Sequence, residues 1–324
     1  MILHHWQGEA PNFGDELNTL LWPRLLPNFF DGKPDVRFLG IGSILDGRHP
    51  ADQVKLVAGS GYAGYESKPR LDRSWVIHWV RGPLTAAAIG VPPHLALGDP
   101  AMLLPLVMSE SSEQPAIPIG FMPHFESLSR GPWEQAAILA GITLIDPRDP
   151  PALVAASVGR CRLLLSESLH GAVVADALRV PWIPLRPLMG MHRSKWRDWA
   201  ETLDLRIRPR ALPAASGAEW LAVSGLAGRH RGRQLIDRYR EELNAIWPAR
   251  LLARAADALR QAAATQPHLS SQHALDRCQS RMMDAITALR RQPIPRSAAR
   301  AGSAPAATDL HQADNSEYQL KPVG

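Results

Sequence analysis

Residues 161–181 read CRLLLSESLHGAVVADALRVP, and this stretch decides the fold class. An apolar run of strand character, Cys161–Leu165, gives way to small polar residues. The Ala/Val-rich run that follows, Ala172–Leu178, has the composition of a helix, which Pro181 then ends. A strand followed at once by a helix is the repeating unit of parallel α/β sheets, so we expect that architecture.

His170 and Gly171 lie where this strand passes into this helix. The unpaired backbone N–H groups of a helix N-terminus and the helix dipole both favour a bound phosphate or carboxylate. Gly171 has no side chain to keep a ligand away from the backbone. The pattern therefore indicates an anion site, while a capped helix start with a surface histidine is the open alternative.

Strands and helices alternate on both sides of this stretch and predict two α/β halves. The Ser/Glu-rich stretch Met108–Pro115 has the composition of a linker, so we divide the chain into residues 1–107, residues 116–228, an Arg-rich helical extension at 229–292 and a tail at 293–324. Ligands of open α/β sheets bind beyond the carboxyl ends of the strands, and we expect the site in a cleft between the halves. The expected strands are Ile2–Trp6, Val36–Ile41, Val54–Ala58, Trp75–Val80, Ile117–Met122, Ile142–Ile145 and Trp182–Leu185, and the expected helices include Asp15–Leu26, Pro83–Ile89, Trp133–Ala140, Ala152–Val158, Leu251–Ala263 and Ala274–Arg291.

The composition is that of a water-soluble globular protein, with 45% hydrophobic and 21% charged residues among 324. No apolar run reaches the roughly 18 residues that cross a bilayer, and the N-terminus lacks the basic leader and apolar core of a signal peptide. Cys161 and Cys278 lie far apart, and no His/Asp/Cys cluster has the spacing of metal ligands. We therefore expect a cytoplasmic protein with neither disulfides nor a bound metal.

The net charge of +5 is concentrated near the C-terminus. Residues 229–300 contain fourteen Arg, no Lys and six acidic residues, which is a net charge of +8. Such helices can lie on an anionic membrane, but a solvated helical face explains them as well. We expect no nucleic acid as a partner, because no recognised binding module accompanies the arginines. The Pro/Ala/Ser-rich residues 293–324 predict a disordered tail.

Two polar turns follow the first two expected strands. Asn12, Gly14 and Asp15 stand together at the start of a helix, where one of the polar side chains could cap that helix or face the expected cleft. Gly42 and Ser43 belong to a G-x-G-S turn, and glycine there lets the backbone approach a ligand closely. A lone G-x-G is a weak signal, and we favour a simple turn as the explanation of this second pattern.

Two further motifs follow the strand that ends at Val80. Arg81 precedes a helix mouth marked by Gly82, Pro83 and Thr85, and a guanidinium there can grip a phosphate or carboxylate with two hydrogen bonds. Asp99, held extended before Pro100, can accept hydrogen bonds from sugar hydroxyls, although Asp-Pro is also a common turn opener.

The motifs together resemble those of the polysaccharide pyruvyl transferases. The matching pieces occur in the family's order and at its rough spacing, and they cover roughly residues 1–204. Within the family, the chain is most similar to the succinoglycan- and xanthan-type ketal-pyruvate transferases of exopolysaccharide biosynthesis. The pieces are Asn12-x-Gly14-Asp15-x-Leu17, Gly42-Ser43, Arg81-Gly82-Pro83-Leu84-Thr85, Gly98-Asp99-Pro100, Leu169-His170-Gly171 and Ala177-Leu178-Arg179-Val180-Pro181-Trp182.

The resemblance implies two Rossmann-like halves in a GT-B-like arrangement, with phosphoenolpyruvate as the donor and no other cofactor. It also implies a lipid-linked oligosaccharide as the acceptor, and therefore work at the inner face of the plasma membrane, with residues 229–292 as a peripheral contact. Many family members carry Arg where this chain has Ser168. The succinoglycan- and xanthan-type relatives also lack that Arg, so we interpret Ser168 as a mark of the subfamily.

Forming a pyruvate ketal requires a grip on two anionic groups, an acid and a base. Arg81 is the candidate clamp for anionic oxygens, His170 the candidate acid or phosphate ligand, and Asp15 the candidate base toward the sugar. Trp196 and Trp199 could stack on a sugar ring, although core packing is the commoner fate of tryptophan. The remaining candidate ligand-binding residues are Asn12, Gly14, Gly42, Ser43, Gly82, Thr85, Asp99, His124, Ser166, Ser168, Gly171, His192 and Lys195.

Two other functions fit the same pattern less closely. One is a GT-B glycosyltransferase that uses a nucleotide sugar, and the other is a non-catalytic scaffold of a polysaccharide assembly complex that acts through the Arg-rich helices. Release of phosphate from phosphoenolpyruvate separates the expected enzyme from both.

Overall fold

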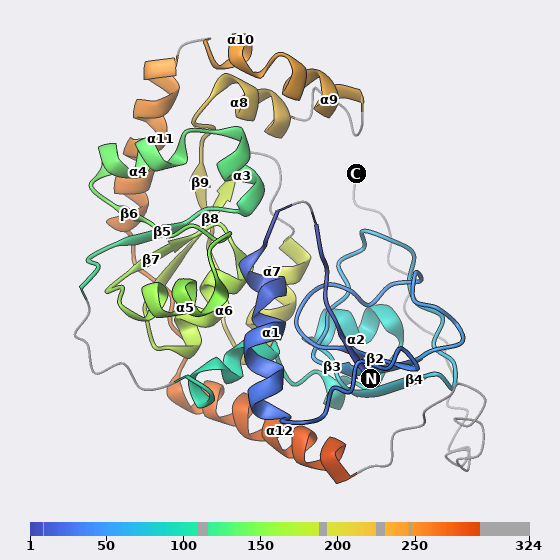
Figure 1. The fold of residues 1–324 in the computed structure, drawn as a ribbon. Helices are drawn as coiled ribbons and strands as arrows, with labels where there is room; N and C mark the ends of the chain where they lie inside the picture. The colour runs from blue at the N-terminus through green and yellow to red at the C-terminus, as the bar shows by residue number, and fades with distance from the viewer. Residues whose placement is uncertain (9, 109–115, 188–192, 225–230, 246–247, 292–324) are drawn as a thin grey trace, which may run out of the picture.

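The computed structural model describes residues 1–8, 10–108, 116–187, 193–224, 231–245 and 248–291. Their architecture is mixed α/β, with one parallel sheet in each half of the chain (Figure 1). The first sheet has four strands in the sequential order β1-β2-β3-β4. These strands are β1 (Ile2–His4), β2 (Val36–Leu39), β3 (Val54–Ala58) and β4 (Trp75–Trp79).

The second sheet has five strands in the order β6-β5-β7-β8-β9. They are β5 (Gly120–Met122), β6 (Thr143–Leu144), β7 (Leu164–Ser166), β8 (Trp182–Pro187) and β9 (Arg210–Leu212). The chain order reverses between β5 and β7, which makes the crevice beyond their carboxyl ends the ligand position of such a sheet. The loop that carries His170 leaves β7 at this point.

Helices of both halves pack into one apolar core. This core joins residues of the first half, such as Leu17 and Trp22, to residues of the second half, such as Val173 and Trp199. The elements of the first half are α1 (Phe13–Leu25), α2 (Pro83–Ile89), η1 (Pro93–Leu95) and η2 (Pro100–Leu106). Those of the second half are α3 (Phe125–Arg130), α4 (Trp133–Ala140), α5 (Pro151–Gly159), α6 (Leu169–Ala177), α7 (Arg193–Ala200), η3 (Glu201–Leu203) and α8 (Gly217–Val223).

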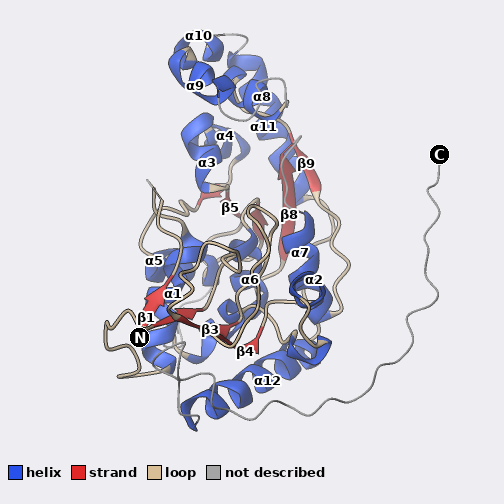
Figure 2. Ribbon diagram, turned by 90° about the vertical axis from the view of Figure 1, so that its right-hand side faces the viewer, coloured by secondary structure: helices blue, strands red, loops and turns tan. Residues whose placement is uncertain are grey.

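The Arg-rich segment that follows is built into this body. After α9 (Arg231–Arg238) and α10 (Arg240–Asn244), α11 (Pro248–Ala263) packs on α4 and on β9 of the second half. The last helix, α12 (Gln272–Arg291), returns beneath the first half, where it contacts β4 and η2 (Figures 1 and 2).

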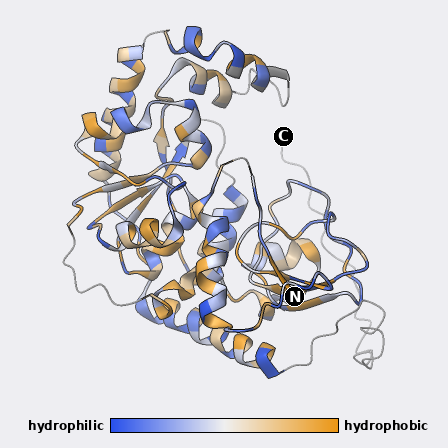
Figure 3. Ribbon diagram, viewed as in Figure 1, coloured by the Kyte–Doolittle hydropathy of each residue, from blue (hydrophilic) through white to orange (hydrophobic). Residues whose placement is uncertain are grey.

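The sequence of α12 explains this position. Apolar residues recur at helical spacing and are buried, among them Leu275, Met282 and Ile286, and Figure 3 shows apolar and polar residues alternating along the helix. Arg277 pairs with Asp204, and other arginines of α12 donate to backbone carbonyls of the first half. Among the described residues, no helix is both long and apolar enough to cross a lipid bilayer.

The expected elements agree with the structure where the pattern is strongly periodic. The predictions of β3, α2 and α4 are confirmed at both ends. The structure also contains α3, α7 and β9, which we did not predict. The helix after β7 begins at Leu169 and not at Ala172, so His170 lies within its first turn. Residues 109–115 of the expected linker and the tail 293–324 lie outside the described residues.

Candidate functional site

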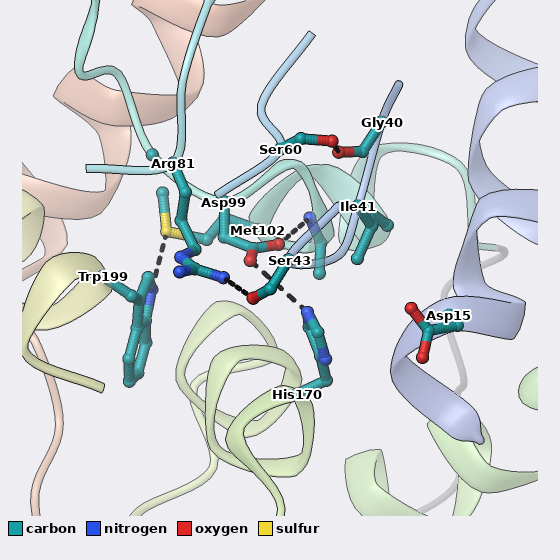
Figure 4. Close-up of polar contacts among 12 residues, drawn as sticks. Asp15, Gly40, Ile41, Ser43, Ser60, Arg81, Asp99, Met102, His170 and Trp199 are labelled. Carbon is teal, nitrogen blue, oxygen red and sulfur yellow. Dashed lines mark hydrogen bonds and ion pairs between the residues drawn. The ribbon is translucent and has the colours of Figure 1, made fainter. Parts of the chain in front are cut away.

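The motifs of the first half meet the His170 loop at the carboxyl edges of the two sheets. In the first sheet, the turns after β1, β2 and β4 carry Asp15, Ser43 and Arg81. From the second sheet, α6 packs against α1 and η2 and brings His170 among them (Figure 4). Residues far apart in the sequence thus form one polar cluster, which we call the junction site.

His170 lies between a buried carboxylate and a glycine. Its Nε2 is 3.4 Å from Oδ2 of Asp99, and neither atom has a closer hydrogen-bond partner among the described residues. A side chain at Gly14 would come within 1.9 Å of the His170 Nδ1, so the glycine makes room for the ring. The histidine is therefore a packed member of the site and not a surface residue of a capped helix.

Asp99 opens the turn into η2, which is one of the two roles that its sequence context predicts. Its side chain is fully buried, and Oδ1 accepts a hydrogen bond from the backbone N–H of Ala101 at the start of η2. Burial raises the pKa of Asp99, but His170 and Arg81 outweigh burial and hold the pKa of this carboxyl below its usual value. Asp99 is thus a buried anion that faces His170, and its burial disagrees with the alternative in which it accepts hydrogen bonds from sugar hydroxyls.

Asp15 lies on the other side of His170, in the first turn of α1. Its Oδ2 accepts a hydrogen bond of 2.5 Å from Nδ2 of Asn12. Neither side chain caps the helix, since Asn12 occupies the N-cap position without a side-chain cap bond. Burial raises the pKa of Asp15 above its usual value, although His170, Asn12 and Lys195 partly oppose this shift. A carboxylate with a raised pKa is a better base than an ordinary aspartate.

Gly42 is required by its backbone. Its φ of +126° lies in a region that side chains rarely adopt, and a Cβ there would lie 3.0 Å from Oδ1 of Asp15. The G-x-G-S turn therefore brings its backbone close to the Asp15 carboxylate. The sequence predicted such a close approach of the backbone, but to a ligand.

Arg81 is completely buried at the end of β4. Its Nε donates to Oδ2 of Asp198 at 3.1 Å, and its Nη1 donates to Oγ of Ser43 at 2.9 Å. The guanidinium lies over Gly61, where a Cβ would come within 2.2 Å of it. Its Nη2 has no hydrogen-bond partner among the described residues, so one cationic donor is left for a ligand.

Asp198 on α7 holds Arg81 and the start of α2 together. Its carboxylate accepts hydrogen bonds from the backbone N–H of Thr85 at 2.9 Å and from the Thr85 hydroxyl at 2.5 Å. A Cβ at Gly82 would meet the Asp198 carbonyl at 1.9 Å. We expected Gly82 and Thr85 to bind substrate, but both are occupied by this contact between the halves.

Lys195 lies one helical turn before Asp198 and adds a second cation. Its Nζ lies 4.8 Å from the centre of the Tyr65 ring. Burial, together with repulsion from Arg81, lowers the pKa of Lys195 to about 8, and Asp15 opposes that shift. Trp196 and Trp199 of the same helix are buried and do not stack on a ligand.

The loop after β7 is shaped by packing. The buried Ser166 hydroxyl donates to the Ser168 carbonyl at 2.7 Å. A Cβ at Gly171 would lie 2.4 Å from that hydroxyl and 2.7 Å from the Met122 sulfur. We expected Gly171 to leave its backbone open to a ligand, but neighbouring side chains fill the space beside it.

The loop after β5 is tied to the loop after β7 by Glu167. This buried carboxylate accepts hydrogen bonds of 2.8 Å from the backbone N–H of His124 and from the Ser127 hydroxyl. Burial raises the pKa of Glu167. His124 therefore lies beside the His170 loop at the N-cap of α3. His192 lies outside the described residues.

Three buried polar residues of the site were not among our candidates. Asn18 bonds to both backbone groups of Ile41 and fixes α1 to the G-x-G-S turn, and a polar residue on the apolar face of a helix was its signal. Asp198 and Glu167 carried no such signal, because their partners lie far away in the sequence or on an unpredicted helix. No group of three or more His, Cys, Asp or Glu able to hold a metal ion occurs in the part of the chain that the structure describes.

Comparisons with known proteins identify a relative. No family model matches the chain. The succinoglycan biosynthesis protein ExoV of Rhizobium meliloti (strain 1021) is 38% identical to it over 219 residues. These residues are 67% of this chain and 69% of the relative.

Proposed function

This chain belongs to the exopolysaccharide pyruvyl transferase family, and we propose that it transfers pyruvate from phosphoenolpyruvate to a sugar of a lipid-linked repeat unit. The product is a pyruvate ketal, and phosphate is released. The observation that carries the proposal is the free Nη2 of the buried Arg81 beside the pair of His170 and Asp99. A small dianionic or trianionic substrate matches this arrangement, because a buried cationic donor needs an anionic acceptor.

The donor's two anionic groups have cationic partners at the junction site. Arg81 and Lys195 supply two positive charges, and His170 lies close to Asp15 on the other side of the site. We assign Arg81 to one anionic group of phosphoenolpyruvate and Lys195 to the other. Ser43 orients the Arg81 guanidinium through its hydroxyl, and Asp198 does so through its carboxylate.

The reaction forms two C2–O bonds in turn. Each step removes a proton from a sugar hydroxyl and delivers one elsewhere, first to C3 of the enolpyruvyl group and then to the phosphate. His170 donates a proton to C3 of the enolpyruvyl group, which creates a methyl group and positive charge at C2. A sugar hydroxyl attacks C2 while Asp15 takes its proton. The C2–O bond to phosphate breaks, and a second hydroxyl of the same sugar forms the other C2–O bond and closes the ring. The second hydroxyl's proton leaves with the phosphate, so the atoms and charges balance. Asp99 faces Nε2 of His170 and orients the ring for the transfer.

The finer features of the proposal follow from the family. We propose a GT-B-like arrangement of the two halves, which the return of α12 to the first half supports. The lipid-linked acceptor implies work at the inner face of the plasma membrane. The proposed membrane contact rests on the Arg-rich composition of residues 229–292, of which Arg277, Arg281 and Arg290 of α12 bind groups of this chain instead.

The deciding experiment combines the purified protein with phosphoenolpyruvate and a panel of lipid-linked oligosaccharides. We expect phosphate release together with a mass gain of one ketal-linked pyruvate on one acceptor. The same panel with nucleotide sugars in place of phosphoenolpyruvate is the control. Sugar transfer from a nucleotide in that control, without phosphate release from phosphoenolpyruvate, refutes the proposal in favour of a glycosyltransferase. No reaction with either donor on any acceptor refutes it in favour of a non-catalytic scaffold.

The role of Asp15 has its own test. Asp15→Asn keeps the shape of the side chain but removes the base, so turnover falls by about 10²-fold or more. Turnover at the wild-type rate in this variant would show that another group removes the sugar proton.

A further inference from the structure

A strip of side chains along α3 leads away from the junction site. Phe125, Glu126, Ser129 and Arg130 stand at positions that share one face of a helix. Ser127 is buried against Glu167, and the neighbouring Leu128 packs on the core of the second half. The strip is therefore the side of α3 opposite the buried Ser127.

An exposed tryptophan extends the strip across to the first half. Trp6, on the loop between β1 and α1, lies with its ring centre 5.9 Å from that of Phe125 and is 39% exposed. Trp6 belongs to the loop after the first strand of its half, which rises toward α3 in Figure 1, and Phe125 is the first residue of α3. Gly8 lies under the Trp6 ring, where a Cβ would be only 1.9 Å away.

A cavity of about 400 Å³ lies at the other end of α3. Ser129 and Arg130 line it on the α3 side, and Gln135 and Asn244 add polar groups from α4 and α10. None of its lining residues belongs to the junction site. The strip thus runs from an aromatic pair beside His124 to a cavity that is lined by both polar and apolar residues.

The strip and the cavity together have the chemistry of an oligosaccharide-binding site. A pyranose ring presents an apolar C–H face, which packs on an aromatic ring, and a rim of hydroxyls. Glu126 and Arg130 form a part-exposed ion pair of 2.8 Å, which offers both acceptors and donors to such hydroxyls. The carboxylate of Glu126 makes the strip unfavourable for a phosphate chain, so a neutral sugar fits it better than a polyanion.

We propose that the strip Trp6–Phe125–Glu126–Ser129–Arg130, together with the cavity, binds the acceptor sugars next to the one that receives pyruvate. This inference rests on the proposed function only in identifying the bound sugars as part of the acceptor. Sugar binding by the strip itself does not depend on pyruvyl transfer. Trp6 makes the main contact with the sugars, and the cavity holds the distal end of the acceptor oligosaccharide. Contacts along α3, and not those at the junction site, then determine which acceptor lengths the protein prefers.

Direct binding tests the strip without any pyruvyl transfer. Isothermal titration of the full chain uses tetrasaccharides of glucose, galactose and mannose, each beside its monosaccharide. We expect at least one tetrasaccharide to bind about tenfold more tightly than its monosaccharide, and Trp6→Ala to remove that advantage. Trp6→Phe retains most of it, and Leu153→Ala, which shortens an exposed apolar side chain on α5, leaves it unchanged.

Kinetics separate this inference from the proposed function. With phosphoenolpyruvate at saturation, Trp6→Ala raises the KM for a lipid-linked acceptor and leaves kcat and the KM for phosphoenolpyruvate near wild type. Phosphate release with an unchanged acceptor KM refutes the strip but keeps the pyruvyl transferase. Length-dependent sugar binding that Trp6→Ala abolishes, without any phosphate release, keeps the strip and refutes the transferase. Equal binding of tetrasaccharides and monosaccharides by the wild type refutes the strip outright.

Discussion

Two buried pairs of ionisable side chains join the halves of this protein, and they are built differently. In one, Asp99 of the first half faces His170 of the second at 3.4 Å, and neither facing atom has a closer partner among the described residues. In the other, Arg81 of the first half meets Asp198 of the second, whose carboxylate also accepts two hydrogen bonds from Thr85. A saturated carboxylate fixes geometry, whereas a loosely held one lets a proton move, so we interpret the second pair as structural and the first as chemical.

The largest effect is expected for the chemical pair. His170→Ala removes the proposed acid and should lower phosphate release by about 10²- to 10⁴-fold. Circular dichroism should still show a folded protein, because the change deletes a side chain that rests on glycine and not a hydrogen-bonded link. Loss of the folded spectrum would mean that His170 holds the halves together as Asp198 does.

The structural pair should respond in stability. Asp198→Ala leaves Arg81 buried without its carboxylate and Thr85 without its acceptor, so the free energy of unfolding should fall by about 3–5 kcal/mol. Denaturant titration measures this change. Arg277→Ala is the matched control, since it breaks the exposed ion pair with Asp204 from a helical position and should cost about 1 kcal/mol or less. Equal losses in the two variants would contradict the structural role of Asp198.

Asp99→Asn sharpens the distinction between the pairs. The amide can still accept from the N–H of Ala101 but carries no charge toward His170. We expect kcat to fall by about 10²-fold with a much smaller loss of stability than in Asp198→Ala. Because the folded-state pKa of Asp99 lies below its usual value, its stabilising effect is present at neutral pH and disappears as the pH falls through that lowered pKa. We therefore expect the free energies of unfolding of the wild type and of Asp99→Asn, measured by urea titration, to differ at neutral pH and to become equal at acid pH.

The smallest effect is a shift along the pH axis. Lys195 has a pKa of about 8, so its positive charge is lost as the pH rises through that value. We expect kcat/KM for phosphoenolpyruvate to decline above about pH 8, since this quantity reports ionisations of the free enzyme. Lys195→Arg should move the decline to higher pH, because guanidinium stays protonated. An unchanged alkaline limb would assign the decline to another group.

Local sequence patterns predicted a large part of the fold and only part of the site. Strongly periodic stretches such as β3 and α4 could be placed at both ends, since their own side chains decide their structure. The helix α7 could not, because it depends on burying Trp196 and Trp199 against distant elements. His170, Arg81 and Asp15 were recognisable from turns between a strand and a helix. The carboxylates that orient them lie 71 residues from His170 and 117 residues from Arg81, and no local pattern relates such positions.

The position of α12 has a consequence for the order in which the chain folds. Its apolar face covers β4 and η2, which leave the ribosome long before residues 272–291 do. At roughly 5–20 residues per second, the first half waits on the order of ten seconds or more for the helix that completes its core. During that interval its apolar surface is open to chaperones or to other nascent chains. The first half of the chain therefore completes its core last. A truncation that removes α12 should lower the yield of folded protein, and this loss should be seen before any loss of specific activity.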